Sequence, residues 1–266
     1  MSTIAIAIAN QKGGVGKSTT AASLATELAL REYETLLIDA DPQSNATQIF
    51  LAPEHVKTSL ADVLIGAGAS IGEKRITTEV EHLDIVPATL SLANFDREPA
   101  LSVTKLRTAL RDLGDYYDFI LIDTPPNFGL LLTTALTAAT HVLIPVQAAP
   151  FALTGLQDLL SVVRNAQDLN EHLTVLGAVC TLYDTRTSVS GASYRALTEM
   201  MPDKTFETII HRQTKLEEAP SMHQPIQLYA PNSRGAEQYS ALTEEVLARL
   251  GKAGKASNLS AVKGGK

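Results

Sequence analysis

Residues 11–19 read QKGGVGKST, and this glycine-rich stretch separates an apolar run at residues 4–9 from an Ala- and Leu-rich segment. A turn of this composition between a strand and a helix binds phosphate, because small residues let several backbone N–H groups converge on one anion. The helix after the turn adds unpaired N–H groups and the positive end of its dipole. The stretch therefore predicts a phosphate-binding loop in an α/β fold.

Two lysines in this loop have different predicted roles. Lys17 and Ser18 occupy the places of the phosphate-pairing lysine and the magnesium-binding hydroxyl of a P-loop. Lys12 is an additional charge near the start of the turn, where an ordinary P-loop has none. From its chemistry alone, Lys12 is either a solvated lysine or part of a site that one subunit does not complete alone.

The composition is that of a globular protein. Of the 266 residues, 45% are apolar, which is enough for a large core, and no apolar run reaches the roughly 18 residues of a membrane span. A single cysteine, Cys180, excludes an internal disulfide and fits a reducing cytoplasm. The net charge of −7 argues against a wholly basic nucleic-acid surface, although a local basic patch remains compatible with it.

Short apolar runs alternate with longer helical patterns along the chain. The runs are rich in Ile, Val and Leu, as in parallel strands buried on both faces, and predict strands at 4–10, 35–39, 83–87, 119–123, 141–145, 174–182 and 206–210. Helices are predicted at 18–32, 103–113, 130–139, 153–169 and 236–250. This order predicts a single doubly wound, mostly parallel sheet with helices on both faces. We expect one domain over residues 1–250, followed by a basic, disordered tail at 251–266.

Three aspartates come at or just after the ends of predicted strands. Asp39 and Asp41 follow one apolar run, and Asp123 ends another. Because ligands bind at the carboxyl ends of parallel strands, we expect these side chains beside the glycine-rich loop. Ser18 and Asp123 suit a magnesium ion that bridges two phosphates, and Asp41 is placed to orient an attacking water. Asp39 and Asp41 are also compatible with ordinary turn or helix-cap roles.

Several motifs resemble the ParA/Soj/MinD family of deviant Walker A ATPases. The loop at 12–18 is similar to that family's Lys-Gly-Gly-Val-Gly-Lys-[Ser/Thr] signature. The stretch DPQSNAT at 41–47 resembles its Asp-Pro-Gln-Gly-Asn-Ala segment, and DTPP at 123–126 resembles its Walker B region. The stretches EAPS at 218–221 and YAPNSRGA at 229–236 fit the ParA/Soj branch. The resemblance extends over roughly the whole predicted domain.

This resemblance implies an ATPase that binds ATP and Mg²⁺ and forms a sandwich dimer on ATP binding. Lys12, Lys17 and Asp41 would be the catalytic set: Lys12 reaches the partner's nucleotide, Lys17 contacts the β- and γ-phosphates, and Asp41 positions the water. Ser18, Asp39 and Asp123 would surround the metal. Thr19 would lie near the α-phosphate, and the loop at Pro231 and Asn232 against the adenine. The implied ATP contacts are Lys12, Gly13, Gly14, Val15, Gly16, Lys17, Ser18, Thr19, Pro231 and Asn232.

The same resemblance implies nonspecific DNA as a binding partner. The positions that match the family's DNA contacts are Arg186, Arg212 and Lys215, each of which is equally compatible with an ordinary solvated charge. Neutralisation of DNA phosphates by such residues makes binding strongly salt-dependent. ParA/Soj members segregate chromosomes or plasmids, and a ParB-like adaptor stimulates their ATP hydrolysis. The expectation is therefore a cytoplasmic, nucleoid-associated partition ATPase.

Two other functions occur among related ATPases. Some position a protein cargo, such as a microcompartment or a chemoreceptor array, and the sequence does not separate this function from DNA partition. MinD-like members bind membranes through a terminal amphipathic helix, which needs bulky apolar residues opposite a basic face. After Leu250 the large apolar residues are Leu259 and Val262, so we do not expect membrane binding.

Two turns depart from the family pattern. Ser44 and His223 stand where the family has glycine. Because glycine reaches backbone angles that other residues rarely adopt, altered angles are expected in both turns.

Overall fold

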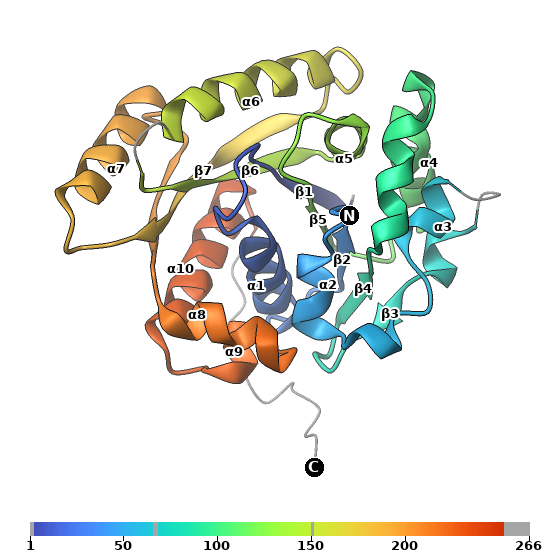
Figure 1. The fold of residues 1–266 in the computed structure, drawn as a ribbon, viewed down its shortest axis with the longest axis horizontal. Coiled ribbons are helices and arrows are strands. Elements are labelled where there is room, and N and C mark those ends of the chain that lie inside the picture. Colours follow the sequence, from blue (N-terminus) through green and yellow to red (C-terminus); the bar gives the residue numbers. More distant parts are fainter. Residues whose placement is uncertain (1–2, 66–68, 150–151, 253–266) are drawn as a thin grey trace.

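The computed structural model describes residues 3–65, 69–149 and 152–252. Its strands are β1 (Ile4–Ile8), β2 (Thr35–Asp39), β3 (Ile76–Thr77), β4 (Leu83–Val86), β5 (Phe119–Asp123), β6 (His141–Gln147), β7 (Thr174–Tyr183) and β8 (Thr205–His211). Within the described residues they form an eight-stranded sheet in the order β3-β4-β2-β5-β1-β6-β7-β8 (Figure 1). The loop after β1 therefore opens between β5 and β6, where ligands bind in doubly wound folds.

Parallel pairing brings the carboxyl ends of the central strands together. Every described strand pair is parallel except β3 with β4. Asp123 on β5 lies in register with Ile8 on β1 and with Asp39 on β2. All residues of β2 and β5 are buried, which explains the apolar residues that precede Asp39 and Asp123 at the strand ends. The two aspartates thus meet at the same edge as the glycine-rich loop.

Helices cover both faces of the sheet (Figure 1). They are α1 (Lys17–Ala29), α2 (Asn45–Phe50), α3 (Leu60–Leu64), α4 (Lys105–Arg111), α5 (Leu130–Ala138), α6 (Ala152–Gln167), α7 (Ser188–Met200), α8 (Thr214–Glu218), α9 (Ile226–Tyr229) and α10 (Arg234–Arg249). Alternate residues of β1 belong to two separate cores: Ala5 and Ala7 pack with residues of α3 to α7, and Ile6 and Ile8 with residues of α1, α2, α9 and α10. This period-two division is that of a sheet buried on both faces.

Each edge of the sheet has a feature that limits pairing with a further strand. At one edge β3 has two residues and pairs antiparallel with β4. At the other edge, side chains of α10 accept hydrogen bonds from backbone N–H groups of β8. The Glu245 carboxylate accepts from Glu207 and Thr208 at 2.9 and 3.1 Å, and the Gln238 amide oxygen accepts from His211 at 3.0 Å. These donors are therefore satisfied within the chain.

The C-terminal end of α10 is attached to the sheet by Arg249. Its guanidinium donates to the carbonyl oxygens of Leu176, Lys204 and Thr205 at distances of 3.1, 3.0 and 2.8 Å. Gly177 makes room for this contact, because a Cβ at that position would lie 2.5 Å from the Lys204 carbonyl oxygen. The close approach of β7, β8 and α10 therefore requires glycine here.

The predicted fold class is confirmed, and the predicted strands are present with small shifts of their ends. The strands predicted at 35–39 and 119–123 have the observed bounds. The sequence prediction did not include β3, α7 or the short helices α2, α3, α8 and α9. The short elements show no periodic pattern, and α7 carries many small polar residues that resemble a loop. Most of the predicted tail at 251–266 lies outside the described residues, so its disorder stays a prediction.

The expected change of backbone angles at Ser44 and His223 is wrong. Both residues adopt the left-handed conformation, with φ of 55° and 52°, which is the region that favours glycine. The contacts around them hold this conformation: the Ser44 carbonyl accepts from Gln48 N–H, and His223 Nδ1 pairs with the Gln48 carbonyl at 2.7 Å. Neighbouring hydrogen bonds thus replace the freedom of glycine.

In the part of the chain that the structure describes, no helix is both long enough and apolar enough to cross a bilayer.

Candidate functional site

The loop between β1 and α1 is shaped to hold an anion. Gly14 and Gly16 have φ of 71° and 85°, a region in which a side chain would be strained. A Cβ at Gly13, Gly14 or Gly16 would meet no atom within 4 Å, so these positions face open space. Gly16 is also the N-cap of α1 and supplies no capping side chain. The first amides of α1 are thereby left for a ligand.

Neighbouring strands hold this loop in place. The Asn10 side chain accepts a hydrogen bond from the Lys12 N–H at 3.0 Å and donates to the Pro145 carbonyl on β6 at 2.7 Å. The Thr181 hydroxyl on β7 donates to the Val15 carbonyl at 2.8 Å. The loop geometry is therefore fixed before a ligand arrives, which reduces the entropy lost on binding.

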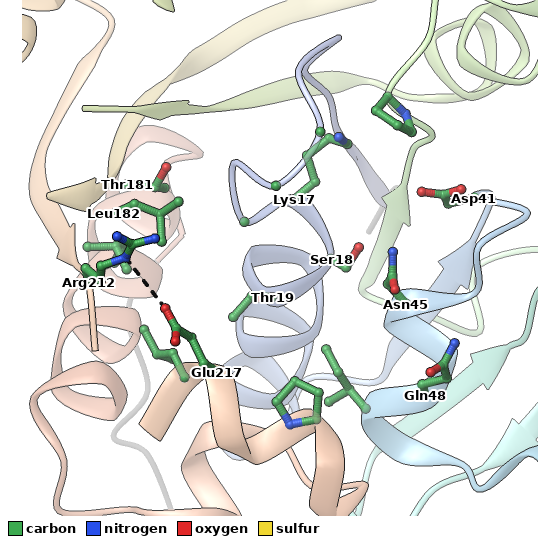
Figure 2. A pocket seen from close by; sticks show the side chains of 18 of the residues that line it. Lys17, Ser18, Thr19, Asp41, Asn45, Gln48, Thr181, Leu182, Arg212 and Glu217 are labelled. Atoms are coloured by element: carbon green, nitrogen blue, oxygen red, sulfur yellow. Dashed lines mark ion pairs between the residues drawn. The ribbon is translucent and has the colours of Figure 1, made fainter. Parts of the chain in front are cut away.

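A cavity of about 470 Å³ opens over the loop. Figure 2 shows the first turn of α1 in its middle, with Asp41 and Asn45 on one side and Leu182 and Arg212 on the other. One end thus combines Lys17 with acidic and amide groups, which suits phosphates and a metal ion. The other end carries apolar side chains from the ends of β7 and β8 and from α8, namely Leu182, Ile210 and Leu216. This wall suits a planar base.

The two lysines of the loop differ in their surroundings. Lys17 is 6% exposed, and its Nζ donates to the Lys12 carbonyl at 3.2 Å. Burial lowers the pKa of Lys17, and the nearby Asp123 and Asp41 oppose this. The Lys12 side chain is exposed, and within the described residues no hydrogen bond or ion pair reaches its ammonium group. Lys17 is therefore held at the cavity wall by its own chain, whereas the Lys12 ammonium group is exposed.

Asp39 and Asp123 lie side by side but have opposite hydrogen-bonding states. Asp39 Oδ1 accepts from the Asp41 N–H, and its Oδ2 accepts from the N–H and hydroxyl of Thr47 at 2.8 and 2.7 Å. Burial raises the pKa of Asp39 to about 6 despite these bonds. Both carboxylate oxygens of Asp123 are buried without a partner among the described residues. Burial raises the pKa of Asp123 well above its ordinary value, and the Asp39 carboxyl adds to the rise.

The unpartnered Asp123 carboxylate fits a divalent cation. An uncompensated buried carboxylate is costly, and a cation beside it removes that cost. Ser18 lies close enough to influence the Asp123 carboxyl and supplies a hydroxyl ligand. In the described chain no group of three His, Cys, Asp or Glu side chains is arranged to hold a metal alone. A Mg²⁺ ion here would therefore depend on phosphate oxygens for the remaining ligands, as in P-loop enzymes. The described hydrogen bonds of Asp39 come from its own chain, and its place beside the metal stays a prediction.

Asp41 lies at the cavity wall. Its Oδ1 accepts a hydrogen bond from the Gln43 N–H at 2.9 Å, which orients the carboxyl group. Burial raises the pKa of Asp41, and the Lys17 ammonium opposes the rise. An oriented carboxylate near the phosphate end is suited to hold a water for attack.

Comparison with known proteins agrees with this geometry. A family model described as an AAA domain matches residues 3–175. The sporulation initiation inhibitor protein Soj of Bacillus subtilis is 43% identical over 248 residues, which are 91% of this chain and 98% of Soj. The chain belongs to the ParA/Soj family of ATPases. The chromosome partitioning protein ParA of Caulobacter vibrioides is 38% identical over 92% of this chain and 94% of its own length.

A solved structure also supports ATP and magnesium as the ligands of this ParA/Soj ATPase. Cobyrinic acid a,c-diamide synthase from Mycobacterium smegmatis, solved with a bound ATP analogue and magnesium, superposes with a TM-score of 0.81. It is 28% identical, and the match covers 97% of this chain and 99% of that one. The ATPase activity and the ATP and Mg²⁺ ligands predicted from the sequence are thus confirmed.

The adenine contacts implied for this ParA/Soj member are not in the cavity. Among the described residues that line it, neither Pro231 nor Asn232 occurs. Pro231 lines a separate hollow with Glu27 and Ser240. The base-sized wall of the cavity comes instead from β7, β8 and α8, which sequence reasoning did not assign. These residues carry no motif of their own, since loop packing alone brings them together. The role of Pro231 and Asn232 stays a prediction.

The three cations implied to bind DNA lie on adjacent segments. Arg186 follows β7, Arg212 follows β8, and Lys215 belongs to α8. The Arg212 N–H donates to the Tyr183 carbonyl at 3.0 Å, which joins the ends of β7 and β8. All three side chains are at least half exposed, at 84%, 60% and 54% respectively. Arg212 additionally lines the nucleotide cavity, which the sequence did not indicate.

Proposed function

We propose that this ParA/Soj ATPase is a DNA partition protein. It dimerises when it binds ATP, the dimer binds DNA without sequence preference, and hydrolysis releases it. The observation that carries the proposal is the exposed Lys12 ammonium group, which lies on a complete phosphate loop yet has no partner among the described residues. The name of the relative at 38% identity, chromosome partitioning protein ParA, supports DNA as the cargo.

The dimer is supported by the arrangement of charges around the phosphates. Lys17 and the α1 amides would serve the nucleotide of their own chain, since Lys17 lines the cavity and the first turn of α1 has no capping side chain. Lys12, on the same loop, adds a positive charge that a second chain's triphosphate would attract. A nucleotide shared in this way links ATP binding to association, because each site is completed by the other chain.

DNA binding would use Arg186, Arg212 and Lys215. Their positions on neighbouring segments and their exposure support a shared cationic surface. A dimer carries two such sets, which strengthens binding through multivalency without sequence readout. Each of these cations forms an ion pair with a neighbouring acid, namely Asp184, Glu217 and Glu218, so DNA phosphates would have to replace these acids as partners. The cellular place of such a protein is the nucleoid in the cytoplasm.

Hydrolysis would rely on positioning. Mg²⁺, when bound, neutralises charge on the phosphates. Asp41 holds the water, Lys17 the phosphates, and Asp123 and Ser18 the metal side of the site. Such a site turns over slowly until a partner completes it, and we propose that a ParB-like adaptor does so. Adaptor-stimulated hydrolysis would then return the dimer to single chains and release the DNA.

Light scattering in four conditions tests the proposal: without ligand, with ATP, with DNA, and with both. We expect the mass of one chain without ATP, twice that mass with ATP, and a DNA complex only when both are present. A dimer that forms with ATP but ignores DNA at low salt would contradict partition and favour a protein cargo. ATP-dependent co-flotation with lipid vesicles would favour a MinD-like membrane role instead.

A further inference from the structure

The nucleotide cavity has two walls that are distant from each other in sequence. One wall includes α2, and the other includes α8 and the short 3₁₀ helix η5 (Ala219–Met222) that follows it. Figure 2 shows Gln48 of α2 and Glu217 of α8 on opposite sides of Thr19. Below the cavity, Ile49 of α2 and Ala219 of η5 belong to the same apolar core. The width of the cavity therefore depends on how α2 and η5 are held relative to each other.

A hydrogen bond from His223 joins these two walls. His223 directly follows η5, and its Nδ1 lies 2.7 Å from the carbonyl oxygen of Gln48, 175 residues away in sequence. Because a carbonyl oxygen only accepts, the Nδ1 atom carries the hydrogen. The Gln48 carbonyl is one of the last in a helix of six residues, and such carbonyls lack partners within their helix. His223 thus supplies a donor that α2 itself does not provide.

The backbone of His223 indicates that this side-chain contact offsets a cost. His223 has a φ of 52° and ends η5 in the left-handed conformation. Glycine adopts this conformation without strain, whereas a residue with a Cβ does so at a cost. Strained positions of this kind persist where the surrounding structure holds them, and they are frequent at ligand sites. Glycine would serve the turn alone, so what histidine adds is the contact of its imidazole with α2.

Gln48 extends the connection to the turn that carries Asp41. Its side-chain amide donates to the Gln43 carbonyl at 3.2 Å and to the Ser44 hydroxyl at 3.3 Å. The Gln43 N–H donates to Asp41 Oδ1 at 2.9 Å. The turn and α2 are therefore joined to each other, and His223 joins both to the opposite wall.

We propose that His223 is a positioning residue that clasps α2 to η5 and fixes the spacing of the two cavity walls for ATP. His223 is not among the described residues that line the cavity, so it acts through α2. The clasp, the hydrogen bond from His223 to Gln48, serves ligand binding, since Asp41 keeps its own bond from Gln43 without it. It concerns the ATP site and does not depend on the proposed binding of DNA.

The test is His223→Gly, which relieves the strained backbone and removes the donor. Titration with a fluorescent, non-hydrolysable ATP analogue and Mg²⁺ should show affinity lower by about three- to tenfold, the range for one lost hydrogen bond. Turnover at saturating ATP should stay within about twofold, because lost ground-state binding raises KM and leaves kcat unchanged. The thermal unfolding midpoint should stay within about 4 °C, since the relieved strain offsets the lost bond.

Two further variants separate the clasp from a general effect of glycine. His223→Asn is the rescue variant, because asparagine tolerates the left-handed conformation and carries Nδ2 on Cγ, as histidine carries Nδ1. Its affinity for the analogue should lie within about twofold of the wild type. His82→Gly is the matched control: His82 has a φ of 64°, its Nδ1 lies 2.7 Å from Glu34, and it precedes β4 at the amino end of the sheet. At this distance from the cavity, it should change affinity less than about twofold.

The outcomes are distinct. Unchanged affinity in His223→Gly would overturn the clasp, and so would equal losses in His223→Gly and His223→Asn. A matching loss in His82→Gly would also overturn it, because glycine rather than the missing contact would then be responsible. Loss of turnover at saturating ATP with unchanged affinity would place the effect on the chemical step and contradict a role in binding.

Discussion

Asp39 and Asp123 are register partners on β2 and β5, yet one carboxylate is fully hydrogen-bonded and the other has no partner among the described residues. The difference arises from the path of the chain beyond each strand. The chain after β2 turns back and brings the Thr47 N–H and hydroxyl to Asp39. The turn after β2 thus satisfies the Asp39 carboxylate, and no corresponding segment of the described chain satisfies Asp123.

Substitution of the two aspartates should therefore have different effects on stability. Asp39→Asn places an amide N–H where donors converge, and we expect the free energy of unfolding to fall by about 1–3 kcal/mol. Asp123→Asn removes a buried, unpartnered carboxylate and should leave that free energy unchanged or higher. Urea unfolding without nucleotide or magnesium measures both. Equal losses would contradict the assigned division of roles.

The two loop lysines should separate ATP binding from association. Lys17→Ala removes a buried charged contact at the cavity, so we expect ATP affinity to fall by at least about tenfold. Lys12→Ala changes an exposed side chain, and ATP affinity should stay within about threefold while the ATP-dependent dimer is lost. Fluorescent-nucleotide titration and light scattering measure the two properties. Equal loss of ATP binding in both variants would make Lys12 an ordinary loop residue.

Asp41→Ala should remove turnover and leave the preceding steps intact. The variant keeps the loop and Lys17, so it is expected to bind ATP and dimerise. Loss of the carboxylate that orients water should lower the rate of phosphate release by about 10²–10⁴-fold. A phosphate-release assay at saturating ATP gives the rate, and light scattering on the same sample gives the oligomeric state. A monomer under these conditions would count against the role of Asp41.

The cationic surface is best tested without Arg212, because that residue also lines the nucleotide cavity. The double variant Arg186→Ala/Lys215→Ala should weaken DNA binding in the ATP state and reduce the salt slope by about two units, one for each lost phosphate contact. ATP affinity, measured in parallel, should remain that of the wild type. An unchanged slope across the salt series would remove both residues from the DNA interface.

Gly177 provides a test of the packing between β7, β8 and α10. Gly177→Ala brings a Cβ to 2.5 Å from the Lys204 carbonyl and into the Arg249 contact, so a loss of about 1–3 kcal/mol in unfolding free energy is expected. Gly191→Ala is the control, since a Cβ there would meet its nearest atoms at 3.6 Å within α7. It should be neutral or stabilising by up to about 1 kcal/mol. Thermal unfolding that ranks the two variants oppositely would contradict this packing.

The sequence was sufficient for the parts of the molecule that depend on local pattern. The short, largely apolar runs of β2 and β5 predicted their bounds, and the register of parallel strands brings Asp39 and Asp123 together. The glycine-rich loop was equally clear, because its backbone angles require glycine at specific positions. These features result from burial and from backbone sterics alone.

Features that depend on distant contacts were not accessible from the sequence. The position of Arg212 in the cavity wall results from how the ends of β7 and β8 meet, and no spacing in the sequence encodes it. The hydrogen bonds of Asp39 depend on Thr47, eight residues later in the chain. Likewise, Ser44 keeps a left-handed conformation because its neighbours hold it there. Tertiary contacts overrode residue preference in each case.

The satisfied N–H groups of β8 and the two-residue β3 have a consequence for how copies of this chain meet one another. An open strand edge is a template on which another chain can add a strand, and such pairing leads to aggregation. Here Glu245 and Gln238 occupy donors at one edge, and the other edge is too short to extend a foreign strand. Copies of this chain that meet are thereby kept from irreversible pairing of their sheet edges.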